Sequence, residues 1–293
     1  MSKPAPTTSE VAGPLNLLRP LLLLSYSAYY IFPTLIDSIL SLNLAVLTSV
    51  SQFKQAWFAR FWAWFGPRSR DNAAGSILPL LQNSARGVCL DIGPGTGQWL
   101  CLFSRANNQE ITKIYGVEPN RGMHKQLREN AANAGLGDIY EIVGCGAEEL
   151  EQRGGLQRES IDTIITVQCL CSIPTPELII NNLFPLLKPG GKWLVFEHIR
   201  TKYQGDFTDY WQSELPSKAR QLPSLTETTE AINLVWPHFF NGCDITRPTD
   251  EWLLHAGKGG WESVDLQPCA GEGRWDTVSA QLVAHRYALR ALD

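Results

Sequence analysis

Beyond residue 72, short apolar runs rich in β-branched residues alternate along the chain with longer, more polar segments. The runs predict strands at 87–92, 112–117, 138–144, 160–167, 192–197, 261–266 and 278–284. The other segments predict helices at 73–83, from residue 98, at 120–134, near 147–154 and at 175–187. Alternation of this kind is typical of a parallel, doubly wound sheet, so we expect an α/β, Rossmann-like fold.

The first seventy residues have a different pattern. Between Arg19 and Lys54 the only charge is Asp37, and the apolar runs 21–32 and 39–47 lie on either side of it. Each run is shorter than the roughly 20 residues that a membrane-spanning helix needs. The apolar region is also too long for a cleaved signal peptide and has no evident cleavage site.

Aromatic side chains dominate residues 53–67, beside Lys54 and Arg60, and no acid follows until Asp71. Tryptophan next to basic residues is typical of a helix in the lipid headgroup region. We therefore expect residues 15–70 to associate with a membrane as a monotopic or re-entrant segment. The alternative is a set of helices that packs over the sheet or covers the active site as a lid.

These patterns divide the chain into three parts. Residues 1–14, which include a short Pro/Ser/Thr-rich stretch, predict a disordered tail, and residues 15–70 form the hydrophobic and aromatic helices. Residues 71–293 form the main domain. It is interrupted at 199–257 by a helical insertion that we expect to bind substrate.

The charge and the cysteine content of the chain indicate which partners and cross-links to expect. The net charge is −4 and no basic field covers the main domain, which argues against a nucleic-acid partner. The seven cysteines contain no C-x-x-C pair and are odd in number, so we expect reduced thiols instead of a disulfide framework. The histidines and cysteines lack ligand spacing along the sequence, so no metal is expected.

The most informative motif follows the strand predicted at 87–92. Asp91 lies near the end of the apolar run, and Gly93, Gly95 and Gly97 alternate before a predicted helix. Glycines let the backbone approach a ligand closely, and free N–H groups at the turn can meet the ligand's polar groups. The spacing acid-x-G-x-G-x-G differs from the dinucleotide fingerprint and is the form used to hold S-adenosylmethionine.

Further cofactor-binding candidates follow the later strands. Glu118 lies 25 residues after Gly93, close to where α/β nucleotide sites place the carboxylate that accepts hydrogen bonds from ribose hydroxyls. Ligands of such sheets bind at the carboxyl ends of the strands. The remaining candidates at those ends are Pro119, Gly146, Ala147, Val167 and Gln168. For Asp91 the alternative is a carboxylate that only braces the glycine loop.

The order and spacing of these motifs, with a Pro-Gly-Gly turn at 189–191, resemble those of class I S-adenosylmethionine-dependent methyltransferases. The resemblance implies a seven-stranded sheet, mostly parallel with an antiparallel final strand, and S-adenosylmethionine as cofactor. Many relatives carry an aspartate after the third strand that accepts from the adenine amino group, whereas Gly146 occupies that place here. Backbone N–H groups around Ala147 would then recognise adenine, with Glu148 as the alternative.

Three further stretches, 168–173, 196–198 and 236–247, point to one group within these methyltransferases. Together they resemble the methyltransferase-like-seven proteins, membrane-associated thiol S-methyltransferases of the endoplasmic reticulum and lipid droplets. This implies a small lipophilic thiol as acceptor and a place on the cytosolic face of the endoplasmic reticulum membrane or on a lipid droplet; a cytoplasmic location is the alternative. A longer insertion between Tyr203 and Asn233 departs from that group and bears on the acceptor more than on the reaction.

Methyl transfer from a sulfonium is an in-line displacement, which depends on holding the nucleophile close and aligned. His198, at the end of the fifth strand, is the first candidate for a base or for a cation that orients a thiolate, with Glu197 beside it. Alternation along a strand sends the two to opposite faces, so only one should face the cleft. His238 and Asp244 are further catalytic candidates, each with a structural role as its alternative. We interpret Cys171 as a packed strand-end cysteine, because the mechanism needs no covalent enzyme intermediate.

The sequence therefore predicts a methyltransferase that acts on a small lipophilic acceptor, with a thiol as the leading substrate. Trp211, Trp236, Phe239 and Phe240 are the candidate lining of the acceptor pocket. O- or N-methylation of a secondary metabolite or lipid is an alternative on the same fold. A membrane or lipid-droplet protein with a vestigial cofactor pocket is a second alternative, against which the intact glycines and Glu118 argue.

Overall fold

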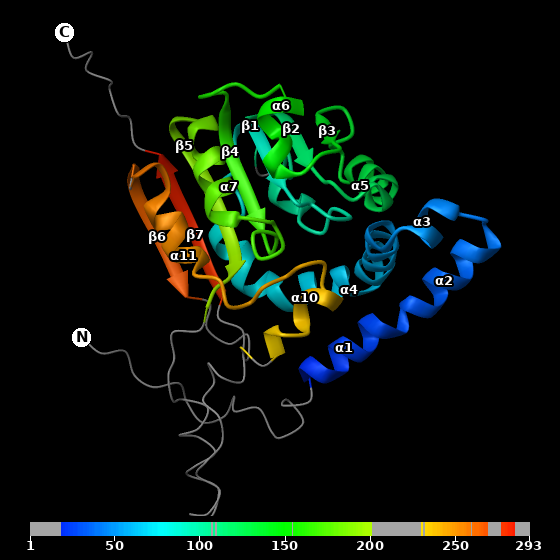
Figure 1. The fold of residues 1–293 in the computed structure, drawn as a ribbon. Helices are drawn as coiled ribbons and strands as arrows, with labels where there is room; N and C mark the ends of the chain where they lie inside the picture. The colour runs from blue at the N-terminus through cyan, green and yellow to red at the C-terminus, as the bar shows by residue number, and fades with distance from the viewer. Residues whose placement is uncertain are drawn as a thin grey trace, which may run out of the picture.

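The computed structural model describes residues 19–284 apart from 107, 109, 154, 201–229, 231, 259 and 269–276. Its centre is a sheet with the strand order β3-β2-β1-β4-β5-β7-β6 (Figure 1). The strands are β1 (Gly87–Ile92), β2 (Ile111–Val117), β3 (Tyr140–Val143), β4 (Ile161–Val167), β5 (Leu187–His198), β6 (Trp261–Pro268) and β7 (Thr277–Ala284). β1 to β5 pair in parallel, whereas β7 runs antiparallel to both β5 and β6. The predicted Rossmann-like, mostly parallel α/β fold is confirmed.

The helices after the strands are shorter than the sequence pattern predicted. They are α5 (Arg121–Asn133), α6 (Leu150–Arg153), α7 (Pro176–Leu183), α10 (Trp236–Phe239) and α11 (Thr249–His255), with 3-10 helices η3 (Leu100–Phe103), η4 (Ala147–Glu149), η5 (Phe184–Leu186) and η6 (Ala256–Lys258). The α-helix predicted from residue 98 is wrong, since only η3 forms there. Leu100, Leu102 and Phe103 are all buried, so this segment packs on several sides and not along one helical stripe. Pro185 falls in η5, where its missing N–H is compatible with the end of α7.

Helices cover both faces of the sheet. On one face the last turns of α4 (Val50–Leu81) pack with η3 and α5, and on the other α7 packs with α6 and α11. The packing residues recur every three or four positions, which places them on one side of each helix. They include Ala73, Ile77 and Leu81 of α4 and Ile179, Ile180 and Leu183 of α7.

α4 joins two segments that the sequence analysis treated separately. The helix predicted at 73–83 is its last third, and the aromatic stretch 53–67 lies in its first two thirds. Pro67 removes one backbone hydrogen bond inside the helix. Fully buried side chains on either side of it, Phe61 and Ile77, anchor both halves to the protein. The aromatic half passes the carboxyl ends of the parallel strands (Figure 1). Several of its rings therefore pack inside the protein, where the sequence analysis expected them to meet lipid headgroups.

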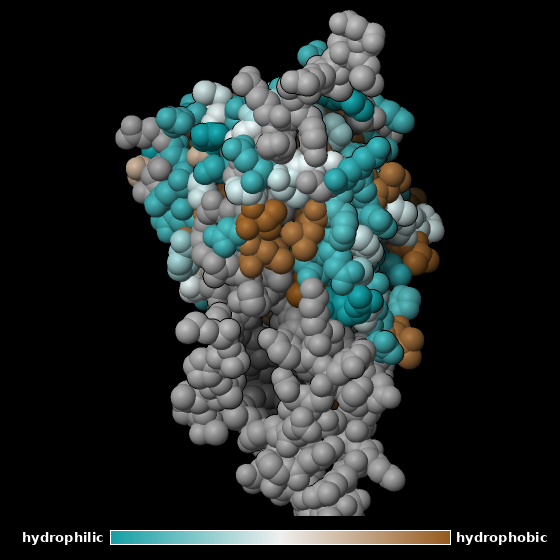
Figure 2. Space-filling view, turned by 90° about the vertical axis from the view of Figure 1, so that its left-hand side faces the viewer, coloured by the Kyte–Doolittle hydropathy of each residue, from teal (hydrophilic) through white to brown (hydrophobic). Residues whose placement is uncertain are grey.

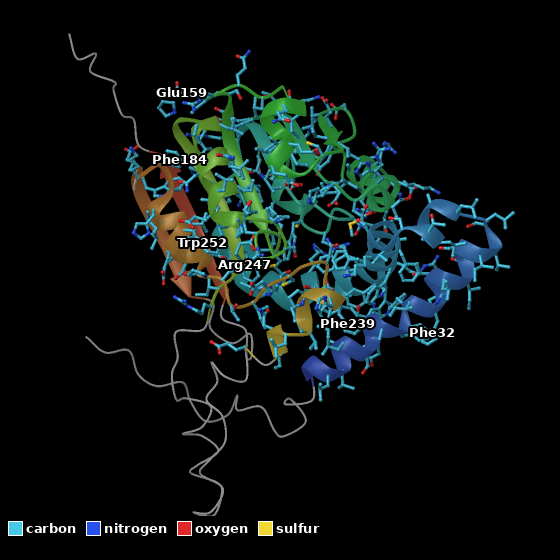
Figure 3. The ribbon with its side chains drawn as sticks, in the orientation of Figure 1. Phe32, Glu159, Phe184, Phe239, Arg247 and Trp252 are labelled. Carbon is cyan, nitrogen blue, oxygen red and sulfur yellow. The ribbon has the colours of Figure 1, made fainter. Side chains whose placement is uncertain are left out.

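Three short helices, α1 (Arg19–Tyr29), α2 (Ile31–Leu40) and α3 (Leu44–Thr48), form an arm that packs on α4 and α10 (Figure 1). The buried residues of this arm are small and polar, namely Ser27, Thr34 and Ser38. The Ser27 hydroxyl donates to the carbonyl of Phe239, which lies between α10 and α1 (Figure 3). The indole N–H of Trp57 donates to the carbonyl of Ser27. Polar contacts of Ser27 thus fasten the inner side of the arm to the protein, and Leu23 and Leu24 pack on the apolar cluster around Phe61.

Large apolar side chains occupy the outer side of the arm. The exposed ones are Leu21, Leu22, Tyr26, Tyr29, Phe32, Leu35, Ile36, Ile39, Leu40, Leu42, Leu44 and Leu47, which we call the outer face; Phe32 lies on the outer side of α2 (Figure 3). The side of the molecule away from the arm is mostly hydrophilic around a small apolar patch (Figure 2). Among the described residues, no helix is both long enough and apolar enough to cross a membrane.

Two of the predicted parts lie wholly or partly outside the described residues. The tail predicted at 1–14 is one of them. In the insertion predicted at 199–257, residues 201–229 lie outside as well, Trp211 among them. The described remainder of the insertion contains α10 and α11.

Candidate active site

A cavity of about 330 Å³ lies at the carboxyl ends of β1, β2, β4 and β5. This is the topological switch point of the sheet, because the chain crosses from one side of β1 to the other between β3 and β4, and it is where ligands of open α/β sheets bind. Side chains of α4 and of the segment 236–245 close the cavity from outside the sheet. A cavity of this size is within the range of small-molecule sites.

The loop after β1 forms one wall of the cavity, which Gly93 and Gly95 line. Both have a left-handed backbone, with φ of 65° and 59°, that glycine adopts without strain. A Cβ on Gly93 would lie 2.6 Å from the Cβ of Cys169, and one on Gly95 would lie 2.7 Å from Nε1 of Trp62. Neighbouring segments therefore press on both sides of this loop, and only glycine fits at these two positions.

Glu118, at the end of β2, lines the cavity beside the glycine loop. One of its carboxylate oxygens accepts from the backbone N–H of Gly95 at 2.9 Å, and the other from that of Asn120 at 2.8 Å. Burial raises the pKa of this carboxyl to about 7, and the two backbone hydrogen bonds oppose that rise. Glu118 is thus held in place between the loop and α5 while part of it remains in contact with the cavity.

Asp91 and Gly97 do not line the cavity, unlike the other cofactor-binding candidates. The carboxylate of Asp91 accepts from the hydroxyl of Tyr140 at 2.8 Å, and burial raises the pKa of this carboxyl to about 7. Asp91 therefore ties β1 to β3, and both its contact with the cofactor and its alternative role as a brace of the glycine loop stay predictions.

The remaining cofactor-binding candidates all line the cavity: Pro119, Gly146, Ala147, Val167 and Gln168. The carboxylate of Glu148 folds against Gly146, since a Cβ at Gly146 would lie 2.3 Å from Oε1 of Glu148. Glu148 lines the cavity too, so it brings a carboxylate close to the position where many relatives carry an aspartate. Gln168 has a φ of 54°, and its side-chain oxygen accepts from the Ser69 hydroxyl at 3.2 Å.

The end of β5 separates His198 from Glu197 as strand alternation predicted. His198 lines the cavity, whereas Glu197 is fully buried outside its lining. The Glu197 carboxylate accepts from the backbone N–H groups of Cys169 and Leu170 at 3.1 Å, which fixes the loop after β4. Burial raises the pKa of the Glu197 carboxyl to about 7.

The two other catalytic candidates lie away from the cavity lining. His238 is exposed on α10. Asp244 accepts from the backbone N–H and hydroxyl of Thr246 and from the side-chain amide of Asn233. Burial acts to raise the pKa of the Asp244 carboxyl, but these hydrogen bonds and Arg247 outweigh it and lower the pKa. Neither side chain contacts the space where a ligand would react.

An aromatic wall encloses the other end of the cavity. It combines two predicted pocket residues with rings of the stretch 53–67, for which a membrane-facing helix and a lid were the alternatives. Phe58, Trp62 and Phe65 of α4 line it together with Trp236 and Phe240. Of the predicted pocket aromatics, Phe239 packs edge-on against Trp57 outside the lining. The spacing of 58, 62 and 65 marks one face of a helix. That signal was available in the sequence, but it does not say which surface the face meets.

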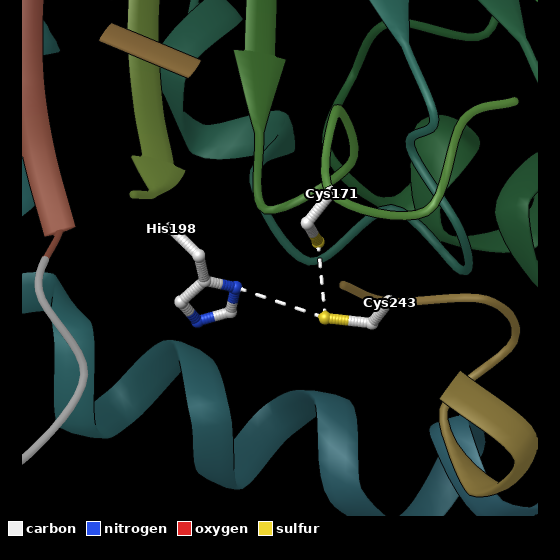
Figure 4. A group of neighbouring side chains, drawn as sticks. All are labelled: Cys171, His198 and Cys243. Carbon is white, nitrogen blue, oxygen red and sulfur yellow. Dashed lines mark hydrogen bonds between the residues drawn. The ribbon is translucent and has the colours of Figure 1, made fainter. Parts of the chain in front are cut away.

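Three cysteines also line the cavity: Cys169 beside Gly93, Cys171 after β4 and Cys243 after α10. The last two lie at its aromatic end. Their sulfur atoms and a ring nitrogen of His198 all lie within 4.8 Å of one another (Figure 4). Cys171 is packed at a strand end as expected, but it faces the cavity. Sequence spacing could not reveal this cluster, because its members come from three separate segments.

Comparison with known proteins gives consistent matches. A family model described as a methyltransferase domain matches residues 67–237. A thiol S-methyltransferase of Rattus norvegicus (TMT1B) is 26% identical over 173 residues, 59% of this chain and 60% of that protein. The human thiol S-methyltransferase TMT1A is 20% identical over 236 residues, 78% of this chain and 85% of that protein. This chain thus spans about three fifths of the length of the rat relative.

The fold has counterparts among solved structures. An O-methyltransferase family protein from Burkholderia thailandensis superimposes with a TM-score of 0.56 at 14% sequence identity. The match covers 91% of this chain and 71% of that chain. At this identity the likeness shows a shared fold alone.

Proposed function

We propose that this chain, which belongs to the family of methyltransferase domains, uses S-adenosylmethionine to methylate the sulfur of a small lipophilic thiol. The observation that carries this proposal is the two-ended cavity. One end is a cradle of backbone and carboxylate, and the other is an aromatic wall that also contains His198 and two cysteines.

The cavity residues fit the cofactor that the family uses. Gly93 and Gly95 line the cavity without side chains of their own, so a ligand can approach their backbone closely. Glu118 is anchored beside it, where α/β nucleotide sites hold a ribose. Bound at this end, S-adenosylmethionine supplies an electrophilic methyl group on its sulfonium.

We assign the residues of the cradle as follows. Glu118 accepts hydrogen bonds from the ribose hydroxyls. Glu148 accepts a hydrogen bond from the adenine amino group, and backbone N–H groups around Ala147 donate to the adenine ring nitrogens. Trp62 covers Gly95 and separates the cofactor end from the acceptor end. Glu197 supports the site from outside the cavity, because its hydrogen bonds hold the loop after β4 in place, and Asp91 ties β1 to β3.

The aromatic end suits an uncharged, apolar acceptor. Phe58, Phe65, Trp236 and Phe240 exclude water there, which strengthens electrostatic interactions with a thiolate. A thiol needs only modest help to lose its proton. His198 is the residue that we assign to receive that proton or to orient the thiolate. The rat and human relatives are named for transfer to thiols, which supports the same acceptor.

The test is methyl transfer from labelled S-adenosylmethionine to a panel of alkyl and aryl thiols, phenols and amines. We expect methylated thiols with the full-length protein and none with Glu118→Ala. Glu141→Ala is the matched control, since Glu141 is an exposed glutamate paired with Lys113. Product on a phenol or an amine but on no thiol would refute the thiol assignment and leave an O- or N-methyltransferase.

We further propose that the outer face of α1–α3 docks on a lipid surface, such as the cytosolic face of the endoplasmic reticulum membrane or a lipid droplet. Helices in water normally turn apolar residues inward, whereas this arm buries Ser27, Thr34 and Ser38 and exposes leucines and aromatics. The one acid of the arm, Asp37, is paired with Arg60. A helix that lies in the interface plane presents such a face to lipid.

Vesicle flotation tests the docking. Full-length protein should float with phosphatidylcholine vesicles, and the variant Phe32→Ser/Ile36→Ser/Leu40→Ser should float much less. Substitution of two exposed residues outside the arm, Leu178→Ser on α7 and Val264→Ser on β6, is the control that should float normally. Protein that stays in the soluble fraction with vesicles in excess would refute the docking.

A further inference from the structure

Cys171, His198 and Cys243 form a compact group of soft ligand atoms at the aromatic end of the cavity (Figure 4). The two sulfur atoms lie 3.2 Å apart, and Nδ1 of His198 lies 3.9 Å from Sγ of Cys243. Both cysteines are buried, and each is a free thiol. Nothing in the methyl transfer derived above requires two cysteines at this place.

Backbone hydrogen bonds fix the three segments that carry these residues. The N–H of Asp244, next to Cys243, donates to the carbonyl of Cys171 at 2.9 Å. The guanidinium of Arg247 donates to the carbonyls of Leu170 and Ile173, on either side of Cys171. The N–H of Arg200, two residues after His198, donates to the carbonyl of Arg247 at 2.7 Å. The cluster is therefore preorganised by the fold.

The composition of the cluster matches a zinc site with an open position. Two thiolates and one imidazole form a known catalytic ligand set, in which a fourth position is left for water or substrate. Zinc bonds of about 2.3 Å to sulfur and 2.0–2.1 Å to nitrogen, at tetrahedral angles, separate two sulfurs by about 3.8 Å and sulfur from nitrogen by about 3.5 Å. The observed separations of 3.2 and 3.9 Å differ from these by about half an ångström, which side-chain rotations can supply.

We propose that Cys171, His198 and Cys243 bind one zinc ion whose fourth position opens into the cavity and takes the sulfur of the acceptor thiol. Zinc binding deprotonates the two cysteines, and their protons pass to solvent. An incoming thiol binds as a thiolate, with its S–H proton also released to water. The assignment of the zinc site depends only on the cluster of Cys171, His198 and Cys243. The assignment of the thiol to its fourth position rests on the proposed function. His198 then acts on the acceptor through the metal.

The first experiment uses the purified full-length protein without S-adenosylmethionine. Protein that has been reduced and stripped of metal is titrated with Zn²⁺ against a chromophoric chelator, and separately with Co²⁺. We expect one ion per chain and, with Co²⁺, thiolate-to-metal charge-transfer absorption together with the intense visible bands of a tetrahedral site. Failure to take up a stoichiometric ion, or a cobalt spectrum without thiolate bands, overturns the proposal. A Cys171–Cys243 disulfide in the native protein, with no metal uptake after reduction, overturns it as well.

Matched cysteine variants locate the ion. Cys171→Ser and Cys243→Ser should each weaken zinc binding by at least about 100-fold, since loss of a group that only supports a ligand already costs 10–100-fold. Cys101→Ser, at a half-buried cysteine on η3, should leave zinc binding unchanged. If the serine variants do not fold, the cobalt spectrum of the wild-type protein still shows whether thiolates bind the metal. Equal zinc affinity in folded Cys243→Ser refutes the site.

A second experiment separates this inference from the proposed function. Thiophenol added to the cobalt-loaded protein should shift the charge-transfer band, and phenol should not. Stoichiometric zinc with no methylation of any thiol would refute the proposed function and leave the metal site. Thiol methylation that is unchanged after the metal is removed would refute the metal's role and leave the proposed function.

Discussion

The two ends of the cavity are built in different ways. The cradle consists of loops that directly follow β1, β2 and β3, and its key groups are backbone atoms and carboxylates. The aromatic end is assembled from α4, the loop after β4, the end of β5 and the segment after α10, which are far apart in the sequence. The difference teaches that the position of the cofactor is set by the sheet itself, whereas the acceptor pocket depends on how outer elements pack upon it. Four changes would sharpen or break this comparison.

The largest effect is expected from Gly93→Ala. A left-handed backbone costs an L-residue on the order of 1–2 kcal/mol, and the new Cβ would lie 2.6 Å from the Cβ of Cys169. We expect the dissociation constant for S-adenosylmethionine, measured by calorimetry, to rise by about 100-fold, which corresponds to about 2.7 kcal/mol. Gly75→Ala, in open space on α4, is the control and should bind the cofactor normally. Normal binding by Gly93→Ala would show that the loop can move and is not a fixed cradle.

A smaller, pH-dependent effect is expected at Glu118. The pKa of this carboxyl is raised to about 7 by burial, so it loses its charge as the pH falls below 7. A neutral carboxyl is a poorer acceptor for ribose hydroxyls, so cofactor affinity should fall by up to about tenfold per pH unit below 7 and stay level above 8. Glu118→Gln should bind roughly 10- to 100-fold more weakly at pH 8, the range for one hydrogen bond to a charged group, with a flat pH profile. Calorimetry between pH 5.5 and 8.5 checks both, and a steep profile in Glu118→Gln would assign the titration to another group.

Phe240→Leu tests whether the aromatic end acts on the acceptor alone. Phe240 is buried against Trp236 with ring centroids 4.1 Å apart, and it lines the cavity. The smaller side chain should raise KM for an aryl thiol by about 10-fold, since a lost apolar contact in a pocket is worth roughly 1–3 kcal/mol. The cofactor's dissociation constant should not change. Phe184→Leu, which removes a ring packed on Trp261 away from the cavity, is the control. An equal loss of cofactor affinity in Phe240→Leu would mean that the two ends are coupled.

The smallest effect is expected on the outer face of the arm. Ile36→Ser should change the free energy of unfolding by less than about 0.5 kcal/mol, because Ile36 is 55% exposed. Phe61→Ala, on the inner side of α4, should cost about 3–5 kcal/mol, because Phe61 is fully buried. Urea unfolding measures both. A large loss of stability in Ile36→Ser would show that the outer face is covered by another part of the chain.

The sequence predicted most of the residues of the cradle, because every sequence signal for them is local. The glycine spacing at 93–97 and the acid 25 residues later fix the turn and the carboxylate within one strand–turn unit each. The alternation of β5 correctly separated His198 from Glu197, since neighbouring side chains of a strand point to opposite faces. Asp91 and Gly97 were the exceptions, since neither lines the cavity. Asp91 has a partner far along the chain. Its partner, the Tyr140 hydroxyl, is 49 residues away and turns the carboxylate away from the cavity lining.

The tertiary structure decided most of the aromatic end, because only His198, Trp236 and Phe240 of its lining were predicted. The aromatic stretch 53–67 has the composition of a membrane-interface helix, yet most of its rings pack inward because α4 crosses the ends of the strands. The apolar face that remains exposed is on α1–α3, where buried serines and a threonine meet the protein. Cys171, His198 and Cys243 show no ligand spacing along the chain and converge only through hydrogen bonds among three loops. By itself the sequence determined the sheet and its glycine loop, because these follow from neighbouring residues; contacts between distant segments determined what faces the acceptor.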